Sequence, residues 1–246
     1  MNFVDKNLFI KTIISYISNN QHIIKPDLFN NKQYNLIITG TIGVGKSTIL
    51  QLISDILEYY DIKINKYPEY ITYNKTGQLL FEMKMNNKIS TFTFQNYILD
   101  IWDTLLTENN FKHSKNINIF ERIPYDAVYC FSNKEYLKGS LTKDEYKLII
   151  AHYKNILQKH NMFEYSDQIK FSKIINDDIN QTISDILNII ILDMENNITH
   201  RCIYLTVNNK DEYYKRLGIR DRNSEDKYTF QILDDYQKYY EQNFGL

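Results

Sequence analysis

The sequence predicts an α/β domain in which helices flank a parallel sheet of four to five strands. Four short apolar runs have the length of buried strands, and segments with helical periodicity separate them. These runs are Leu36–Thr39, Ile62–Tyr67, Ile117–Phe120 and Cys202–Val207. A glycine-rich loop also lies between the first run and a helical segment, an order that fits such a sheet. The 246 residues suit a single domain spanning residues 1–246.

Residues 1–33, ahead of the first strand, are expected to form a helical extension. Apolar residues recur at helical spacing between Phe3 and Ile17. The first 18 residues contain no arginine and no small-residue cleavage site, so neither a signal peptide nor a transit peptide is indicated. The chain has two cysteines without metal-ligand spacing. A reduced cytoplasmic protein is therefore expected, with a mitochondrial one as the alternative.

The loop after the first strand fits the phosphate-loop pattern G-x-x-x-x-G-K-[ST]. Its residues are Gly40, Thr41, Ile42, Gly43, Val44, Gly45, Lys46, Ser47 and Thr48. The glycines allow backbone N–H groups to surround a polyphosphate, Lys46 can reach the terminal phosphates, and the Ser47 hydroxyl can hold Mg²⁺. Apolar residues at positions 49, 52, 53, 56 and 57 predict a helix directly after the loop. The pattern therefore predicts that the chain binds a nucleoside triphosphate.

Charged residues follow the other three strands at the points where these strands end. Glu69 comes after the second strand, and Glu121 with Arg122 comes after the third. A predicted helix after the fourth strand carries Arg216, Arg220, Arg222 and Glu225. Because the carboxyl ends of parallel strands meet at one edge of a sheet, all these groups are expected beside the phosphate loop.

Charge and hydropathy exclude two classes of partner. The chain has 29 basic and 30 acidic residues, so no net positive field favours nucleic acid. No apolar run approaches the roughly 20 residues that cross a membrane. The longest run, Ile186–Leu192, is short and contains Asn188. A small molecule is therefore the expected ligand.

Five features, in order along the chain, make it resemble the deoxynucleoside kinase family. They are Gly40–Thr48, Pro68-Glu69, Phe92-Thr93-Phe94-Gln95, Glu121-Arg122 with Phe131, and Arg216-x-x-x-Arg220-x-Arg222-x-x-Glu225. Their order and spacing make the set more specific than any one of them. The resemblance implies a P-loop kinase fold, ATP with Mg²⁺ as phosphate donor, a deoxynucleoside as acceptor, and a homodimer.

The resemblance assigns the chemical step to residues at the strand ends. Glu69 would accept the proton of the 5′-hydroxyl, which is a poor nucleophile while protonated. Arg122 would orient Glu69, and Glu121 would bind Mg²⁺ together with Ser47. Lys46 and a lid at about residues 213–226 would stabilise charge on the transferring phosphoryl group. The arginines of this lid are Arg216, Arg220 and Arg222.

The same resemblance places further residues around the nucleoside. Gln95 would read the edge of the base, because its amide offers one acceptor and two donors. Phe131 would stack on the base, and Glu225 would bind the 3′-hydroxyl. Lys84 stands where the family usually has a tyrosine near the sugar.

Other departures from the family bear on the substrate and the sheet. Ala127 replaces an aspartate of the cytidine- and purine-preferring members, which favours a pyrimidine, thymidine-like substrate, although Asp126 next to it could restore a carboxylate. Ile123 replaces the usual serine. The segment at about 163–197 is expected to be an insertion with helical structure. The chain ends soon after the lid, so the core is expected to have four strands or to take a fifth from elsewhere.

Two other functions fit part of this pattern. A thymidylate kinase or another nucleoside monophosphate kinase would share the sheet and the lid, but it needs extra cations for the substrate phosphate. A non-catalytic kinase-like protein, with a nucleotide-binding or structural role, is the third possibility, since a fold does not imply a function.

Overall fold

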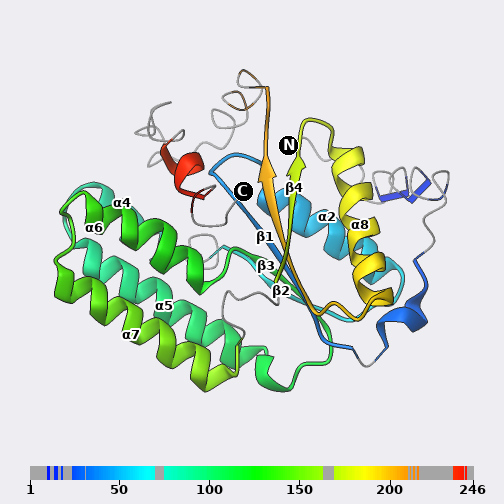
Figure 1. Cartoon of the computed structure of the whole chain (residues 1–246), viewed down its shortest axis with the longest axis horizontal. Coiled ribbons are helices and arrows are strands. Elements are labelled where there is room, and N and C mark those ends of the chain that lie inside the picture. The colour runs from blue at the N-terminus through cyan, green and yellow to red at the C-terminus, as the bar shows by residue number, and fades with distance from the viewer. Residues whose placement is uncertain are drawn as a thin grey trace.

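Figure 1 shows a computed structural model of the chain. The structure describes residues 10–11, 14–15, 18, 24–30, 32–69, 75–162, 169–209, 211, 213, 215, 235–240 and 242. Most of the predicted helical extension over residues 1–33 lies outside these residues, as does most of the predicted lid over residues 213–226.

Five parallel strands form one sheet in the order β2-β3-β1-β5-β4 (Figure 1). The strands are β1 (Tyr34–Gly40), β2 (Ile64–Tyr67), β3 (Ile117–Glu121), β4 (Lys170–Ile175) and β5 (His200–Thr206). The predicted α/β class and the four predicted strands are thus confirmed. The central strand β1 is buried throughout and leads into the phosphate loop. The ends of β3 and β5 therefore flank that loop, which is where parallel sheets bind ligands.

The fifth strand, β4, lies in the segment 163–197 that was expected to be an insertion. It pairs with β5 from Lys170, opposite Arg201, to Ile175, opposite Thr206. Because β4 is an edge strand with exposed positions, its sequence lacks the continuous apolar run of a fully buried strand. This explains why periodicity did not predict this strand, although a fifth strand from elsewhere was one of the two alternatives for the core. That the segment is an insertion relative to the family stays a prediction.

The helix expected within the same segment is confirmed as α8 (Ile179–Glu195). It begins at Asp178, whose carboxylate accepts hydrogen bonds from the backbone N–H groups of Asn180 and Gln181 at 2.8 and 3.3 Å. The remaining helices include α2 (Lys46–Tyr59), α4 (Lys75–Met85), α5 (Thr91–Glu108), α6 (Asn133–Leu137) and α7 (Lys143–His160). Two short 3-10 helices are η1 (Pro26–Phe29) and η2 (Phe111–His113), and η3 (Asp126–Ser132) is a π-helix.

The helices cover the sheet on both faces, with α2 and α8 on one side and α4 to α7 on the other (Figure 1). Alternate residues of β1 divide between two buried clusters, as the period of a strand requires. Leu36 and Ile38 belong to the cluster with α2 and α8, whereas Ile37 belongs to the cluster with α5 and α7. Every residue of β1 is thus buried, which keeps the strand in register.

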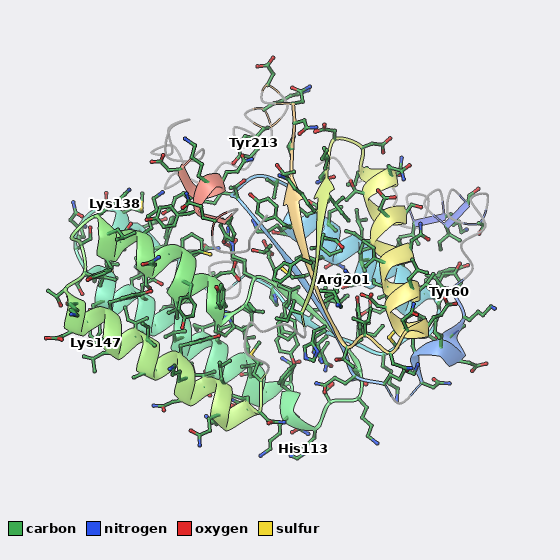
Figure 2. All side chains as sticks on the ribbon, viewed as in Figure 1. Tyr60, His113, Lys138, Lys147, Arg201 and Tyr213 are labelled. Carbon is green, nitrogen blue, oxygen red and sulfur yellow. The ribbon has the colours of Figure 1, made fainter. Side chains whose placement is uncertain are left out.

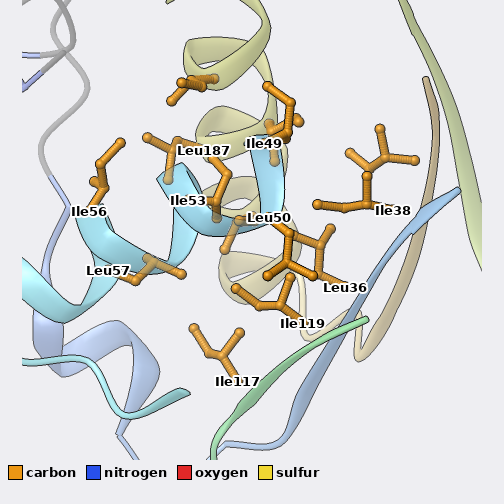
Figure 3. Packing of buried hydrophobic residues seen from close by; sticks show 14 of the residues in the cluster. Leu36, Ile38, Ile49, Leu50, Ile53, Ile56, Leu57, Ile117, Ile119 and Leu187 are labelled. Carbon is orange, nitrogen blue, oxygen red and sulfur yellow. The ribbon is translucent and has the colours of Figure 1, made fainter. Parts of the chain in front are cut away.

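The helix after the phosphate loop is held by its apolar face. Figure 3 shows Ile49, Ile53 and Leu57 of α2 among the buried side chains of the sheet and α8. These three side chains have no measurable exposure. Their packing fixes the start of α2, and with it the position of Lys46 and Ser47.

Within the described part of the chain, no helix is long and apolar enough to cross a membrane.

Candidate active site

The phosphate loop joins β1 to α2 through glycines at positions that a side chain could not occupy. Gly40 has φ = 139°, and a Cβ atom there would lie 2.4 Å from the carbonyl oxygen of Leu205 in β5. Gly45, directly before α2, has φ = 94° and is in the left-handed region. The strand, loop and helix predicted over Gly40–Thr48 are present in the predicted order.

Lys46 is folded back over the loop. Its Nζ donates a hydrogen bond to the carbonyl oxygen of Thr41 at 2.8 Å, and the residue is buried. The ammonium group is therefore held against the backbone of the phosphate loop. A positive charge beside a helix N-terminus suits the terminal phosphates of a nucleotide.

Ser47 and Glu121 meet at the end of β3. The Ser47 hydroxyl donates a hydrogen bond to Oε1 of Glu121 at 2.9 Å. Burial, followed by the nearby charge of Glu69, raises the pKa of the Glu121 carboxyl, while Lys46 and Arg122 oppose the shift. A hydroxyl and a carboxylate next to a phosphate site are the oxygen ligands that Mg²⁺ takes alongside nucleotide oxygens, so these residues fit the metal predicted for them.

Glu69 and Arg122 form a buried ion pair between the ends of β2 and β3. Nη1 of Arg122 donates to Oε1 of Glu69, and Nη2 donates to the carbonyl oxygen of Gly40 at 3.4 Å. Both residues are at most 4 % exposed. The side chain of Arg122 thus connects the carboxylate directly to the first residue of the phosphate loop.

The backbone of Arg122 has an unusual conformation directly after β3. Its φ is 65°, in the left-handed region that residues other than glycine seldom adopt. The N–H of Arg122 continues the sheet by donating to the carbonyl oxygen of Ile38 at 3.0 Å. The chain therefore turns away from the sheet directly after the last hydrogen bond between β3 and β1.

Phe131 lies next to the arginine of this pair. The guanidinium carbon of Arg122 is 5.0 Å from the centre of the Phe131 ring. The same ring contacts Tyr236 and Tyr240 of the C-terminal helix, with ring centres 5.5 and 6.2 Å apart. Phe131 is half-buried, so part of its surface is available to a ligand beside Arg122.

Gln95 is placed on the buried face of α5. The helix begins at Ser90, whose hydroxyl accepts a hydrogen bond from the N–H of Thr93. Gln95 is 4 % exposed, and within the described part of the chain its Oε1 has no hydrogen-bond partner. A buried acceptor of this kind is costly unless a ligand donates to it.

The carboxylate of Asp126 is engaged in hydrogen bonds within the protein, which leaves it no role in base recognition. Its carboxylate accepts hydrogen bonds from the Thr39 hydroxyl at 2.7 Å and from the N–H of Ile123 at 2.9 Å. Ala127 beside it is buried in the apolar cluster of α5 and α7. The carboxylate that could have replaced the missing family aspartate is thus engaged with β1.

Lys84 lies on α4 and forms an ion pair with Glu135 of α6, with Nζ and Oε2 3.8 Å apart. The partner Glu135 lies four residues after Phe131 in the chain. Within the described residues, no contact links Lys84 to Glu69 or Arg122. Arg216, Arg220, Arg222 and Glu225 lie outside the described residues.

Two residues that contact the phosphate loop were not predicted. Asn176, after β4, donates to the carbonyl oxygen of Val44, and Tyr213, after β5, donates to that of Ile42. Both are more than 130 positions away from the loop, and neither belongs to a motif. Only the pairing of β4 and β5 beside β1 brings them there.

The parallel sheet, the phosphate loop and the carboxylate–arginine pair at its edge define a nucleotide-dependent phosphotransferase with a P-loop kinase fold. The chain belongs to the deoxynucleoside kinase family, because the model of that family, described as deoxynucleoside kinase, matches residues 36–183, more than half of the chain. It is therefore an enzyme that phosphorylates a nucleoside with ATP. The non-catalytic alternative is set aside.

The fold has a counterpart among solved structures. A deoxyadenosine kinase from M. mycoides, solved with bound dATP, matches with a TM-score of 0.51 and 20% sequence identity. The match covers 87% of this chain and 84% of that one. No curated protein matches the chain in a sequence comparison.

Proposed function

We propose that the enzyme transfers the γ-phosphate of ATP·Mg²⁺ to the 5′-hydroxyl of a pyrimidine deoxynucleoside, with thymidine favoured. The observation that carries this proposal is the buried Glu69–Arg122 pair, because Arg122 also bonds to Gly40 of the phosphate loop. A carboxylate in this position can accept a proton within reach of the donor's terminal phosphate.

Each residue of the pair has a separate task in the proposed mechanism. Glu69 accepts the 5′-hydroxyl proton as the oxygen attacks the γ-phosphorus atom, the bond from that atom to the β-phosphate oxygen breaks, and ADP leaves. Arg122 holds the carboxylate in a fixed direction through the hydrogen bond of their ion pair. Lys46 stabilises negative charge on the transferring group. Ser47 and Glu121 would hold Mg²⁺, which neutralises the charge of the β- and γ-phosphates when it is bound.

The preference for a thymidine-like base rests on three side chains. The buried Oε1 of Gln95 can accept a hydrogen bond from a base N–H. Phe131 offers a ring beside Arg122 for stacking. Asp126 is engaged with Thr39 and Ile123, so the proposed base pocket takes no carboxylate from it. A pocket without this carboxylate suits a carbonyl-bearing pyrimidine better than an amino-bearing base.

The lid, the sugar contacts and the assembly belong to the same proposal. Arg222 and Arg220, with Arg216 next, would close over the phosphates, and Glu225 would bind the 3′-hydroxyl. Lys84 would lie near the sugar. The enzyme would act as a homodimer, as its family resemblance implies.

A substrate panel tests the proposed function. Purified enzyme is assayed with ATP·Mg²⁺ and each of thymidine, deoxycytidine, deoxyadenosine and deoxyguanosine, with thymidine monophosphate as a further acceptor. The highest kcat/KM is expected with thymidine. Deoxyadenosine belongs in the panel because the relative from M. mycoides is named for it. A higher kcat/KM for either purine would refute the base preference, and activity on the monophosphate alone would make the enzyme a monophosphate kinase.

A further inference from the structure

Three backbone carbonyl groups of the phosphate loop are each capped by a side chain. Nζ of Lys46 donates to Thr41, the hydroxyl of Tyr213 donates to Ile42 at 2.5 Å, and Nδ2 of Asn176 donates to Val44 at 2.7 Å. Lys46 is part of the phosphate-binding pattern. Asn176 directly follows β4 and Tyr213 lies in the segment after β5, and neither has a part in that pattern.

A cap on a carbonyl oxygen also orients the next N–H group. The peptide unit is planar and trans, so the C=O of one residue and the N–H of the next point in opposite directions. The contact with Val44 therefore directs the N–H of Gly45 to the opposite side, and the contact with Ile42 does the same for Gly43. An anion-binding loop needs its N–H groups to converge, and peptide units next to glycine turn most easily away from that arrangement.

Asn176 is held rigidly enough to act as such a cap. It is 3 % exposed, and its own N–H donates to the carbonyl oxygen of Thr206 at 2.7 Å, which extends the pairing of β4 and β5 by one residue. Its Nδ2 also lies 2.6 Å from the position that a Cβ of Gly45 would take. The next residue, Asp177, accepts a hydrogen bond from the N–H of Asn208 at 3.1 Å. The turn after β4 is thus fastened to the segment after β5.

Tyr213 approaches the loop from the segment after β5. Figure 2 shows it beyond the carboxyl end of the sheet. Its hydroxyl also lies 3.3 Å from Oγ1 of Thr41, and its N–H donates to the carbonyl oxygen of Asn209 at 3.0 Å. Two different segments therefore bind the same loop, one at the carbonyl group of Ile42 and the other at that of Val44.

We propose that Asn176 and Tyr213 are positioning residues of the phosphate-donor site, which aim the N–H groups of Gly45 and Gly43 at the triphosphate. The proposal rests on ATP binding at the phosphate loop and not on the choice of acceptor. It assigns a donor-site role to the turn that follows β4.

Binding of ADP·Mg²⁺, measured by isothermal titration calorimetry, tests the proposal on the full-length chain. Asn176→Ala removes the hydrogen bond to Val44, and Tyr213→Phe removes the hydroxyl that contacts Ile42 and Thr41, so each variant is expected to raise the Kd by about three- to tenfold. The KM for ATP is expected to rise in parallel, while the KM for the deoxynucleoside stays within about twofold, a split that a general loss of structure would not produce.

Two control variants lose a side-chain amide or a tyrosine hydroxyl at positions away from the phosphate loop. Asn196, at the other end of α8, is exposed and donates its side-chain amide to the carbonyl oxygen of Leu192. Tyr59 is 58 % exposed. Asn196→Ala and Tyr59→Phe are expected to leave the Kd for ADP unchanged.

Two results would overturn the proposal. One is a Kd for ADP that stays within twofold of the wild type in both Asn176→Ala and Tyr213→Phe. The other is an equal rise of the KM values for ATP and for the nucleoside. If Asn176→Ala does not fold, Tyr213→Phe decides alone, because it removes only a hydroxyl. The ADP titration contains no acceptor, so a wrong assignment of the nucleoside cannot affect its outcome.

Discussion

Arg122 joins the proposed general base to the phosphate loop: one Nη atom donates to Glu69 and the other to the carbonyl oxygen of Gly40 at 3.4 Å. The pair lies between the ends of two neighbouring strands and is almost fully buried. A buried carboxylate with a fixed arginine keeps its direction before any substrate arrives. In the proposed mechanism, the arrangement therefore prepares the acceptor side and the donor side of the site together.

Replacing Glu69 by glutamine is expected to lower kcat by about 10²- to 10⁴-fold, the usual range for the loss of a general base. The amide keeps the shape and can still accept a hydrogen bond from Arg122, so nucleoside binding should be largely retained. Steady-state kinetics and calorimetry measure the two quantities. The exposed Glu82 of α4 offers the control Glu82→Gln. An unchanged kcat in Glu69→Gln would remove Glu69 from the mechanism.

Glu121→Gln is expected to make the ligand-free protein more stable at pH 7 and to weaken its use of Mg²⁺. The folded protein raises the pKa of this carboxyl above 4.5, mainly through burial. A raised carboxyl pKa means that the ionised group opposes folding above pH 4.5, and that this cost disappears below it. Glu121→Gln should therefore stabilise the ligand-free protein at pH 7 but not at pH 4.

The metal side of the same variant needs a separate measurement. Since Glu121 is the proposed Mg²⁺ ligand beside Ser47, the Mg²⁺ concentration for half-maximal activity should rise at least several-fold in Glu121→Gln. Thermal unfolding at pH 4 and pH 7 and a Mg²⁺ titration of activity check the two effects. Both expectations would be contradicted if Glu121→Gln were less stable than the wild type at pH 7 and had an unchanged Mg²⁺ requirement.

Lys134→Met is expected to stabilise the protein at pH 7, by about 1 kcal/mol after allowance for solvent screening. Lys134 is 2 % exposed, its Nζ lies 3.3 Å from the ring centre of Tyr236, and burial lowers its pKa from 10.5 to about 8. Between pH 8 and 10.5 the unfolded chain binds more protons than the folded one, so wild-type stability should rise over this range.

The advantage of Lys134→Met should accordingly shrink as pH rises and vanish near pH 10.5. Denaturant unfolding at several pH values measures this trend. Lys154 is exposed, and Lys154→Met serves as the control for removing an ammonium group from the surface. A difference in stability that is constant with pH would argue against a lowered pKa of Lys134.

Arg222→Ala is expected to slow phosphoryl transfer more than it weakens nucleoside binding. A guanidinium that contacts the transferring group stabilises charge present mainly in the transition state, so a loss of about 10²-fold or more in kcat is expected. The kcat and the Kd for the nucleoside are compared with those of the wild type. Equal losses in both would place Arg222 in ground-state binding instead.

Local patterns were sufficient for the donor half of the site. The order of strand, glycine loop and helix over residues 35–59 involves neighbours in sequence, and the structure contains it as predicted. Glu69 and Arg122 could also be found, because the ends of parallel strands share one edge. The strand β4 could not, since an edge strand with exposed positions has no continuous apolar run.

The sequence by itself determined the class of the fold, the phosphate loop and the charged residue types at the sheet edge, because apolar periodicity and motif spacing act over short stretches of chain. Tertiary structure alone decided which groups meet. It paired Arg122 with both Glu69 and Gly40, turned Asp126 toward Thr39, and brought Asn176 to Val44. These contacts depend on strand order and register, which arise from packing across the whole sheet and leave no local pattern.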